Sequence, residues 1–151
     1  MANGAIAPFR GVPESESITR NEREGVETMR RYYQRVWNDD NTDAIDDLVT
    51  PDFKIHRDGF VLQGRQALKD HVKETKINFD KLRVHLEGIV AMREIVAIRL
   101  NVWHQNVRGE WLRFKGVDVS TVRNGQITET SVSYGQSEPI ADAEASKLLK
   151  W

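Results

Sequence analysis

Three side chains of the sequence are suited to moving protons: Asp118, His56 and His104. Asp118 falls in a stretch of alternating character, where it shares one strand face with apolar residues such as Phe114 while charged residues point the other way. Burying a carboxylate on an apolar face is costly and raises its pKa. The pattern therefore predicts a general base for work near neutral pH, with a structural bridge to an arginine or a hydroxyl as the alternative.

The two histidines are candidates for the acid that would work with this base. His104 ends the apolar face of the stretch 96–102, which places it near one rim of the expected cavity, and His56 ends a short predicted strand. A histidine and an aspartate within hydrogen-bond reach can move a proton next to a carbonyl, whereas the alternative for each histidine is an ordinary core or surface position. His71 and His85 are weaker candidates, because His85 points away from the apolar face and His71 lies on a helix with a charged exposed side.

Aromatic side chains at helical and strand spacing predict the walls of a pocket for a flat ligand, with plain core packing as the alternative. The residues expected to bind substrate are Tyr33, Trp37, Phe114, Val132 and Tyr134. Trp103 and Trp111 fall on the opposite sheet face from Asp118, so they predict an exposed aromatic surface and a dimer contact.

Helices are expected to dominate the first half of the chain. Asn21 and Glu24 have the spacing of a capping box, and apolar residues then recur at helical spacing to about Asn38. The further elements expected in this half are a short helix from 41 or 42 to the residue before Pro51, a strand over 53–57 and a helix over 65–75.

The second half changes to the period of strands. Alternation predicts strands around 82–86, over 94–105, over 110–123 and over 126–134. Asn124-Gly125 is a strong hairpin signal, because both turn positions favour positive φ. Ser137-Glu-Pro139 is expected to open a terminal helix that contains Ile140, Leu148 and Leu149. We thus expect an arm over 1–20, one α+β domain over 21–136 and a helical tail over 137–151.

Bulk composition narrows the functional class. The chain has 151 residues, a formal net charge of -1 and no cysteine, so one domain is expected and neither nucleic acid nor an anionic membrane is an expected partner. No apolar run is long enough to span a bilayer and the start lacks a secretory pattern, which predicts a cytoplasmic protein. The histidine spacing matches no compact ligand set, so no metal and no other cofactor is expected.

Four segments of the chain resemble the SnoaL-like polyketide cyclase branch of the nuclear transport factor two-like superfamily. In order they read VETMRRYYQRVW (26–37), LVTPDF (48–53), GRQAL (64–68) and GVDVSTVRNGQI (116–127), and the resemblance covers roughly residues 22–136. It implies a cone-shaped, cystatin-like α+β fold, in which a curved antiparallel sheet wraps around three N-terminal helices. In this branch polar pocket residues often occupy the stretch that holds His56.

The chain also departs from this family at its catalytic positions. The resemblance implies a catalytic aspartate on the last strand and a histidine on the preceding strand, but these positions hold Val132 and Asp118. Arg99 and Asn101 are loosely similar to the Arg-x-Asp pair of limonene epoxide hydrolase-like members, with Asn in place of the acid, so epoxide opening is not expected. The family mechanism therefore does not transfer directly.

The leading hypothesis is a cofactor-independent enzyme that cyclises, isomerises or dehydrates a hydrophobic, ring-containing or polyketide-like metabolite. In it Asp118 takes a proton and His56 or His104 returns it or polarises a carbonyl. The alternative, motivated by Val132, is a non-catalytic module of the same fold that binds a small ligand or a partner. A purely structural dimer module is the third possibility, favoured if the helices fill the cone. A homodimer is expected in any case.

Overall fold

The computed structural model describes residues 18–148, apart from the side chain of Leu148. The expected arm lies almost entirely in residues 1–17, outside the described part, as does Leu149. In chain order the elements are α1 (Arg20–Arg31), η1 (Tyr32–Asn38), η2 (Thr42–Ala44), α2 (Ile45–Leu48), β1 (Val49–Arg57), β2 (Phe60–Gln63), α3 (Arg65–Asn78), β3 (Asp80–Met92), β4 (Ile95–Gln105), β5 (Trp111–Arg123), β6 (Gln126–Tyr134), β7 (Glu138–Pro139) and α4 (Asp142–Leu148).

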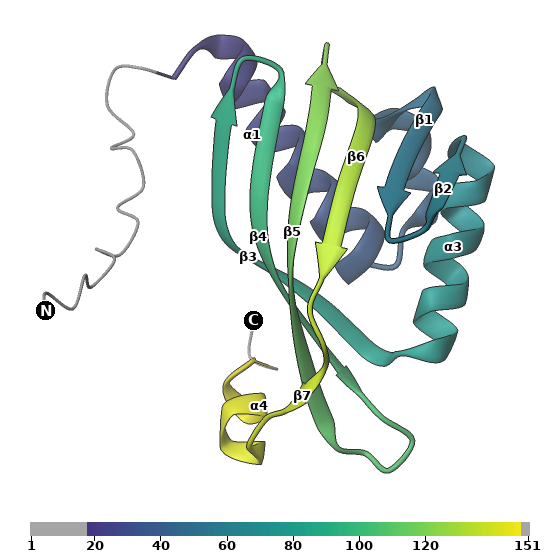
Figure 1. Cartoon of the computed structure of the whole chain (residues 1–151), viewed down its shortest axis with the longest axis vertical. Helices are drawn as coiled ribbons and strands as arrows, with labels where there is room; N and C mark the ends of the chain where they lie inside the picture. The colour runs from purple at the N-terminus through teal and green to yellow at the C-terminus, as the bar shows by residue number, and fades with distance from the viewer. Residues whose placement is uncertain (1–17, 149–151) are drawn as a thin grey trace, which may run out of the picture.

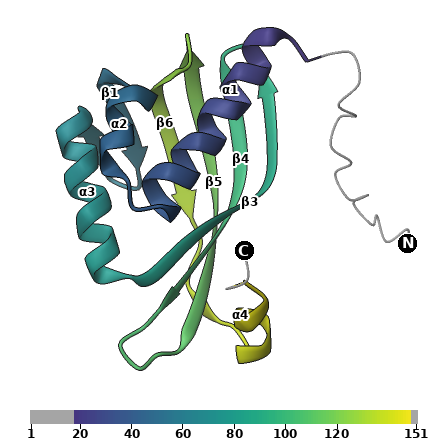
Figure 2. The ribbon, with the colours of Figure 1, turned by 180° about the vertical axis from the view of Figure 1, so that it is seen from behind.

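The strands form one curved sheet in the order β2-β1-β6-β5-β4-β3, with β7 paired to β5. β1 runs parallel to β6, and all other neighbours are antiparallel. Figure 1 views the sheet with α1 behind it, and Figure 2 shows α1, α2 and α3 together on the near side. The predicted α+β architecture of three N-terminal helices against one face of a curved sheet is confirmed.

The first helix begins earlier than predicted. The capping box uses Thr19 and Glu22, because the Thr19 hydroxyl accepts from the Glu22 backbone N–H and the Glu22 carboxylate accepts from that of Thr19, each at 3.2 Å. Asn21 and Glu24 have the same spacing, but both lie within α1, after its N-cap. From Tyr32 the helix continues as a π-helix, a form often found at functional sites.

The region around Pro51 also differs from the prediction. The second helix is a 3-10 turn followed by four residues, and it ends at Leu48. Val49 and Thr50 already belong to β1, whose pairing with β6 shifts register between Val49 and Lys54. This irregularity accommodates Pro51, which has no backbone N–H for the ladder. The short strand β2 was not predicted.

The hairpin and the long strands of the second half are confirmed. Asn124 and Gly125 have φ of 51° and 72°, as a two-residue hairpin turn requires. In the middle of β5, Gly116, Asp118 and Ser120 are buried and alternate with exposed Val117 and Val119. The predicted face of β5 is therefore the one that turns toward the helices.

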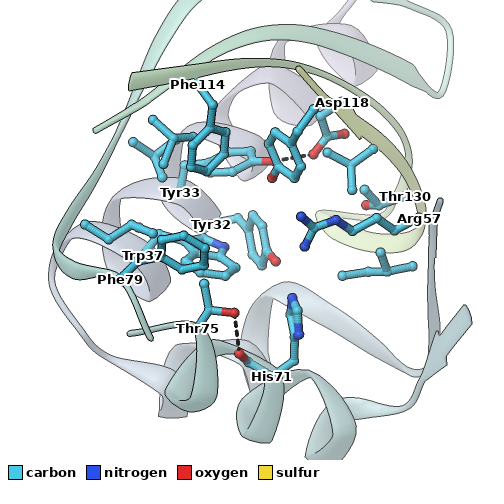
Figure 3. Close-up of a pocket in the computed structure, with 16 residues that line it drawn as sticks. Tyr32, Tyr33, Trp37, Arg57, His71, Thr75, Phe79, Phe114, Asp118 and Thr130 are labelled. Carbon is cyan, nitrogen blue, oxygen red and sulfur yellow. Dashed lines mark hydrogen bonds between the residues drawn. The ribbon is translucent and has the colours of Figure 1, made fainter. Parts of the chain in front are cut away.

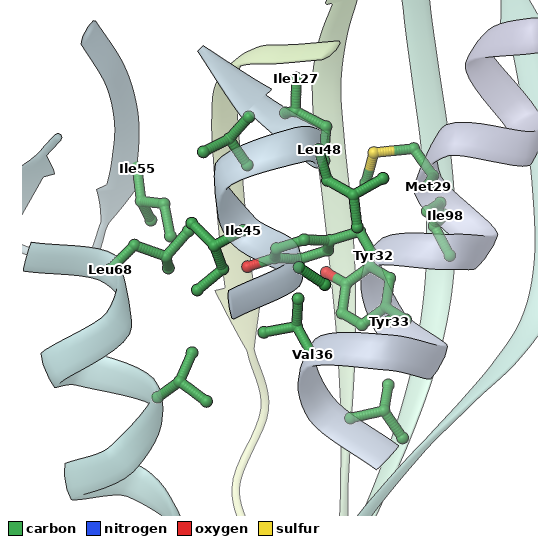
Figure 4. Packing of buried hydrophobic residues seen from close by; sticks show 14 of the residues in the cluster. Met29, Tyr32, Tyr33, Val36, Ile45, Leu48, Ile55, Leu68, Ile98 and Ile127 are labelled. Atoms are coloured by element: carbon green, nitrogen blue, oxygen red, sulfur yellow. The ribbon is translucent and has the colours of Figure 1, made fainter. Parts of the chain in front are cut away.

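The main core fills the space between the helices and the sheet. Met29, Ile45, Leu68 and Ile127 are 0% exposed, and each contributes roughly 1.5–3 kcal/mol by leaving water. Figure 4 shows these side chains converging from α1, α2, α3 and β6. Tyr32 and Tyr33 enter the same core from η1, so the aromatic wall of the site is anchored in the most buried part of the molecule.

The C-terminal tail changes the interpretation of the outer sheet face. Glu138–Pro139 is a strand paired to Leu112 and Arg113, and the terminal helix begins only at Asp142. Ala145 and Ile140 pack on Trp103 and Trp111, which are only 7% and 9% exposed.

The predicted exposed aromatic surface is therefore wrong, because the chain's own tail covers it, and the homodimer stays a prediction without this support. No helix within residues 18–148 has the length and apolar character needed to cross a membrane.

Candidate active site

Asp118 lies in the middle of β5 and is 0% exposed. Its carboxylate accepts a short hydrogen bond from the Tyr33 hydroxyl and a 2.6 Å hydrogen bond from the Ser120 hydroxyl. The Ser120 hydroxyl lies 2.8 Å from that of Thr130 on β6, so a chain of polar groups crosses two strands. The strand period places Asp118 and Ser120 on the same face, and η1 brings Tyr33 to it.

Burial decides the protonation of this carboxyl group. Removal from water raises the pKa of Asp118 to about 6, although the hydrogen bonds from Ser120 and Tyr33 lower it in part. Burial also raises the pKa of Tyr33 well above its usual value, so the phenol stays a hydrogen-bond donor. Asp118 is thus ionised at neutral pH but takes up a proton readily, as a general base requires.

Asp118 forms part of the wall of a cavity of about 90 Å³. Figure 3 shows its aromatic lining and the polar groups that reach into it. All five residues expected to bind substrate contribute to this wall. The residues that line the cavity are Tyr32, Tyr33, Trp37, Ile55, Arg57, His71, Thr75, Phe79, Leu82, Val84, Val102, Phe114, Asp118, Thr130, Val132 and Tyr134. The position of these five residues fits their expected role, which stays a prediction.

His56 does not reach the cavity, so its expected pocket position is wrong. Its imidazole lies on the other face of β1, where it is 41% exposed and its Nε2 lies 2.5 Å from a carboxylate oxygen of Glu129. The reason is the pleat of the strand, because Ile55 and Arg57, on either side of it, line the cavity.

His104 is on the predicted inner face but lies behind the wall. It is 4% exposed, and its ring centroid is 4.8 Å from that of Phe79 and 5.8 Å from that of Phe114. Within residues 18–148, neither ring nitrogen has a hydrogen-bonding partner. Burial lowers the pKa of His104, although the nearby Gln105 backbone raises it in part, so the ring is neutral at pH 7. The structure separates it from Asp118 by the aromatic wall.

Arg57, which the sequence analysis does not name as a candidate, and His71, which it ranks as a weaker one, both line the cavity. Arg57 follows Phe53 and Ile55 at the strand period, which is the signal that could have found it. His71 follows Leu68 by one helical turn and lies next to Val72, on the buried side of α3. Burial and the charge of Arg57 lower the pKa of His71, which keeps this imidazole neutral at pH 7.

Tyr134 is seated by a glycine on the neighbouring strand. Gly116 pairs with Tyr134, and a Cβ at this glycine would lie 2.4 Å from the tyrosine ring. The ring meets Phe114 edge to face at 5.2 Å, and the Arg57 guanidinium lies over it at 4.8 Å from the ring centre. Burial raises the pKa of Tyr134 to about 12, so its hydroxyl keeps its proton.

Within the part of the chain that the structure describes, no three histidine, aspartate or glutamate side chains gather as a metal site would require. The polar groups of the cavity are instead one carboxylate, one guanidinium, one imidazole, the indole N–H of Trp37 and several hydroxyls. This set suits the transfer of protons and the binding of an oxygen atom that carries negative charge.

Comparison with known proteins gives a family and a set of similar folds. The family model of the SnoaL-like domain matches residues 29–130, and no curated protein matches the chain. A protein from Jannaschia sp. CCS1, provisionally described as a SnoaL-like polyketide cyclase, has a TM-score of 0.72 and 17% identity, covering 87% of this chain and 94% of its own.

Two further structures come from other functional classes. An LEH-like epoxide hydrolase from M. tuberculosis has a TM-score of 0.65 and 16% identity, covering 76% of this chain and 84% of its own. A protein from Kribbella flavida DSM 17836, provisionally described as a ketosteroid isomerase, has a TM-score of 0.67 and 16% identity, covering 83% and 88%. At these identities the likeness shows a shared fold, which hosts several chemistries.

Proposed function

The chain belongs to the SnoaL-like domain family, and from this premise we propose that it is a cofactor-independent enzyme acting by acid/base catalysis. Its substrate is a hydrophobic, ring-containing or polyketide-like metabolite, and its reaction is a cyclisation, isomerisation or dehydration. The observation that carries the proposal is Asp118, a fully buried carboxylate with a pKa of about 6 in the wall of an aromatic cavity.

Asp118 takes a proton from a carbon next to a carbonyl group of the substrate. Its pKa lies close to neutral pH, which is the range in which a general base combines ionisation with proton affinity. The hydrogen bonds from Tyr33 and Ser120 hold the carboxylate in one orientation and leave it anchored when it gains the proton. Such positioning accounts for much of the advantage of an enzyme over free acetate.

The return of the proton is also assigned to Asp118. The two histidines first considered for this step lie outside the cavity wall, at the surface and behind Phe79 and Phe114 respectively. A single carboxyl group that accepts a proton at one carbon and gives it to another completes an isomerisation without a second titrating residue. His71 faces the same cavity as a neutral imidazole and supplies a hydrogen bond there.

The size of the cavity limits how the substrate enters. Its volume of about 90 Å³ is below the roughly 150 Å³ of an engineered protein cavity that accepts benzene. A ring-bearing substrate therefore places only its reacting end inside, or it displaces aromatic side chains of the wall. Both routes bring the carbonyl end of the molecule to the polar groups.

The test compares the wild type with Asp118→Asn. Both proteins are incubated with a metabolite extract of the source cells, and the products are compared by mass spectrometry. We expect a compound that the wild type converts and the variant converts at least about 100-fold more slowly, since general acid/base catalysis contributes about 10²–10⁴-fold. Asp58→Asn, in the exposed turn before β2, is the matched control and keeps full activity.

Circular dichroism shows whether Asp118→Asn keeps the fold. Full turnover in a folded Asp118→Asn protein would contradict the assignment of the base. A compound that both proteins bind and neither changes would favour the alternative, a module that binds a small ligand without chemistry.

A further inference from the structure

Arg57 brings a positive charge to the cavity without a carboxylate to neutralise it. It is partly buried at the end of β1, and Figure 3 shows its guanidinium pointing into the cavity from the side opposite Trp37. Within residues 18–148 it forms neither an ion pair nor a hydrogen bond through its side chain; its described contact is the face of Tyr134 at 4.8 Å.

A guanidinium that lies unpaired at a cavity wall is suited to bind an anionic ligand. Charged groups withdrawn from water are normally paired, and a cation–π contact replaces only part of the lost hydration. Asp118 does not serve as the partner, since its carboxylate is held by Tyr33 and Ser120 and the guanidinium is not among the causes of its pKa. The positive charge of Arg57 acts electrostatically on other groups of the cavity, since it lowers the pKa of His71.

We propose that Arg57 is the subsite for a planar, delocalised oxyanion of the substrate. A guanidinium donates two parallel N–H groups in a fixed fork, and this geometry matches the oxygen atoms of a carboxylate or the oxygen of an enolate better than it matches a neutral group. The substrate is accordingly a metabolite whose reacting end carries a carboxylate or carries a carbonyl group that ionises during the reaction. The enolate case rests on the proposed function.

In the enolate case the charges balance as follows. Asp118 takes the proton of a carbon next to the carbonyl, the electron pair of the broken C–H bond forms a C=C bond, and the carbonyl oxygen becomes negative. Arg57 then stabilises this oxygen. When the substrate carries a C=C bond next to the deprotonated carbon, the proton on Asp118 returns to the far carbon of that bond, the double bond shifts into conjugation and the carbonyl group re-forms. No atom or electron is left over, and the negative charge passes from Asp118 to an oxygen beside a cation.

The subsite is tested by binding, independently of turnover. Propionate and its neutral isostere propionamide, both small enough for the cavity, are titrated against the full chain and followed by NMR. We expect the wild type to bind propionate about tenfold or more tighter than propionamide, because the hydrogen bonds to propionate are charge-assisted. Arg57→Met loses this preference, and Arg57→Lys keeps part of it.

Matched variants separate the subsite from general effects. Arg108→Met removes an exposed arginine in the turn between β4 and β5, and it leaves propionate binding unchanged. Arg57→Gln gives a second neutral variant if Arg57→Met does not fold. Asp118→Asn binds propionate as well as the wild type or better, since it removes a negative charge from the same cavity.

A second measurement identifies the source of the oxyanion. Butanone is incubated with each protein in heavy water, and deuterium uptake next to its carbonyl is followed by NMR. If deuterium exchange requires both Asp118 and Arg57, the subsite binds an enolate. If propionate binds but the exchange does not depend on Arg57, the subsite binds a carboxylate that the substrate already carries.

The proposal is overturned if the wild type binds propionate no tighter than propionamide, or if folded Arg57→Met and Arg57→Gln proteins keep the preference. The two proposals fail separately: full turnover in Asp118→Asn removes the proposed base but does not affect the propionate result.

Discussion

Two regions of the inner sheet face each hold a buried polar side chain, and their surroundings differ. In the middle, Asp118 receives hydrogen bonds from Tyr33 and Ser120 and forms part of the cavity wall. Near the end of β4, His104 lies between Phe79 and Phe114 and has no described partner for its ring nitrogens. A buried titratable group is thus suited to chemistry where partners orient it and a cavity reaches it, and only the first region meets both conditions.

The two regions also respond to pH in opposite directions. The pKa of Asp118 is raised on folding, so the native state binds more protons than the unfolded state between 3.8 and about 6, and this group makes the protein less stable as pH rises through that range. The pKa of His104 is lowered from 6.5, so the unfolded state binds more protons and stability is lost as pH falls below 6.5.

The largest expected effect comes from removing the Asp118 titration. The change of pKa from 3.8 to about 6 corresponds to about 3 kcal/mol of unfolding free energy, at about 1.36 kcal/mol for each pH unit. The unfolding free energy of Asp118→Asn should not fall in this way between acidic and neutral pH. The stability of the variant relative to the wild type should therefore increase as pH rises. Urea denaturation across that range measures the difference.

The control for this measurement is Asp58→Asn, which removes an exposed carboxylate and keeps the pH dependence of the wild type. If Asp118→Asn and the wild type lose stability in parallel from acidic to neutral pH, the carboxyl group is not desolvated as the structure indicates, and the comparison between the two regions breaks down.

Periodicity predicted the middle region well. The alternation along β5 assigned Asp118 to the buried face, and the helical stripe assigned Tyr33 and Trp37 to the same interior. Both signals are local, because they depend on the side-chain period of one element. Ser120, two residues further along β5, follows from the same strand period. The other partner, Tyr33, depends on how η1 crosses the sheet, and no local period contains that information.

The errors concern position. The family resemblance implies polar pocket residues in the stretch that holds His56, whereas the strand period assigns Arg57 to the cavity and His56 to the surface. To predict that Trp103 and Trp111 are covered, one would have to know the path of the C-terminal tail, which pairs with β5 only after Ser137. Such long-range contacts are set by the whole fold.

A smaller effect is expected from Ser120→Ala. The Ser120 hydroxyl lowers the pKa of Asp118, so its removal should raise that pKa further, by about one pH unit or about 1.4 kcal/mol. The acidic limb of the rate profile should therefore move from about 6 to higher pH, because the base is the ionised form. Initial rates with the converted metabolite, measured against pH, give the midpoint.

Ser131→Ala is the matched control, since Ser131 is the neighbouring residue of Thr130 on β6 and lies exposed on the outer face. Its rate profile should coincide with that of the wild type. A profile of Ser120→Ala that does not move, in a protein that still turns over the metabolite, would mean that the acidic limb belongs to another group.

The smallest effect, and the sharpest test of the contrast, is expected from His104→Leu. Leucine is similar in volume and carries no polar atom, so the change removes buried ring nitrogens that lack described partners, at little cost in packing. We expect a gain of up to about 1 kcal/mol, largest on the acidic side of 6.5 where the wild-type histidine opposes folding, and a turnover changed by less than about twofold. Thermal unfolding at acidic and neutral pH, together with initial rates, measures both. Loss of turnover in a folded His104→Leu protein would show that the aromatic wall does not isolate His104, because its proton would then be needed in the cavity.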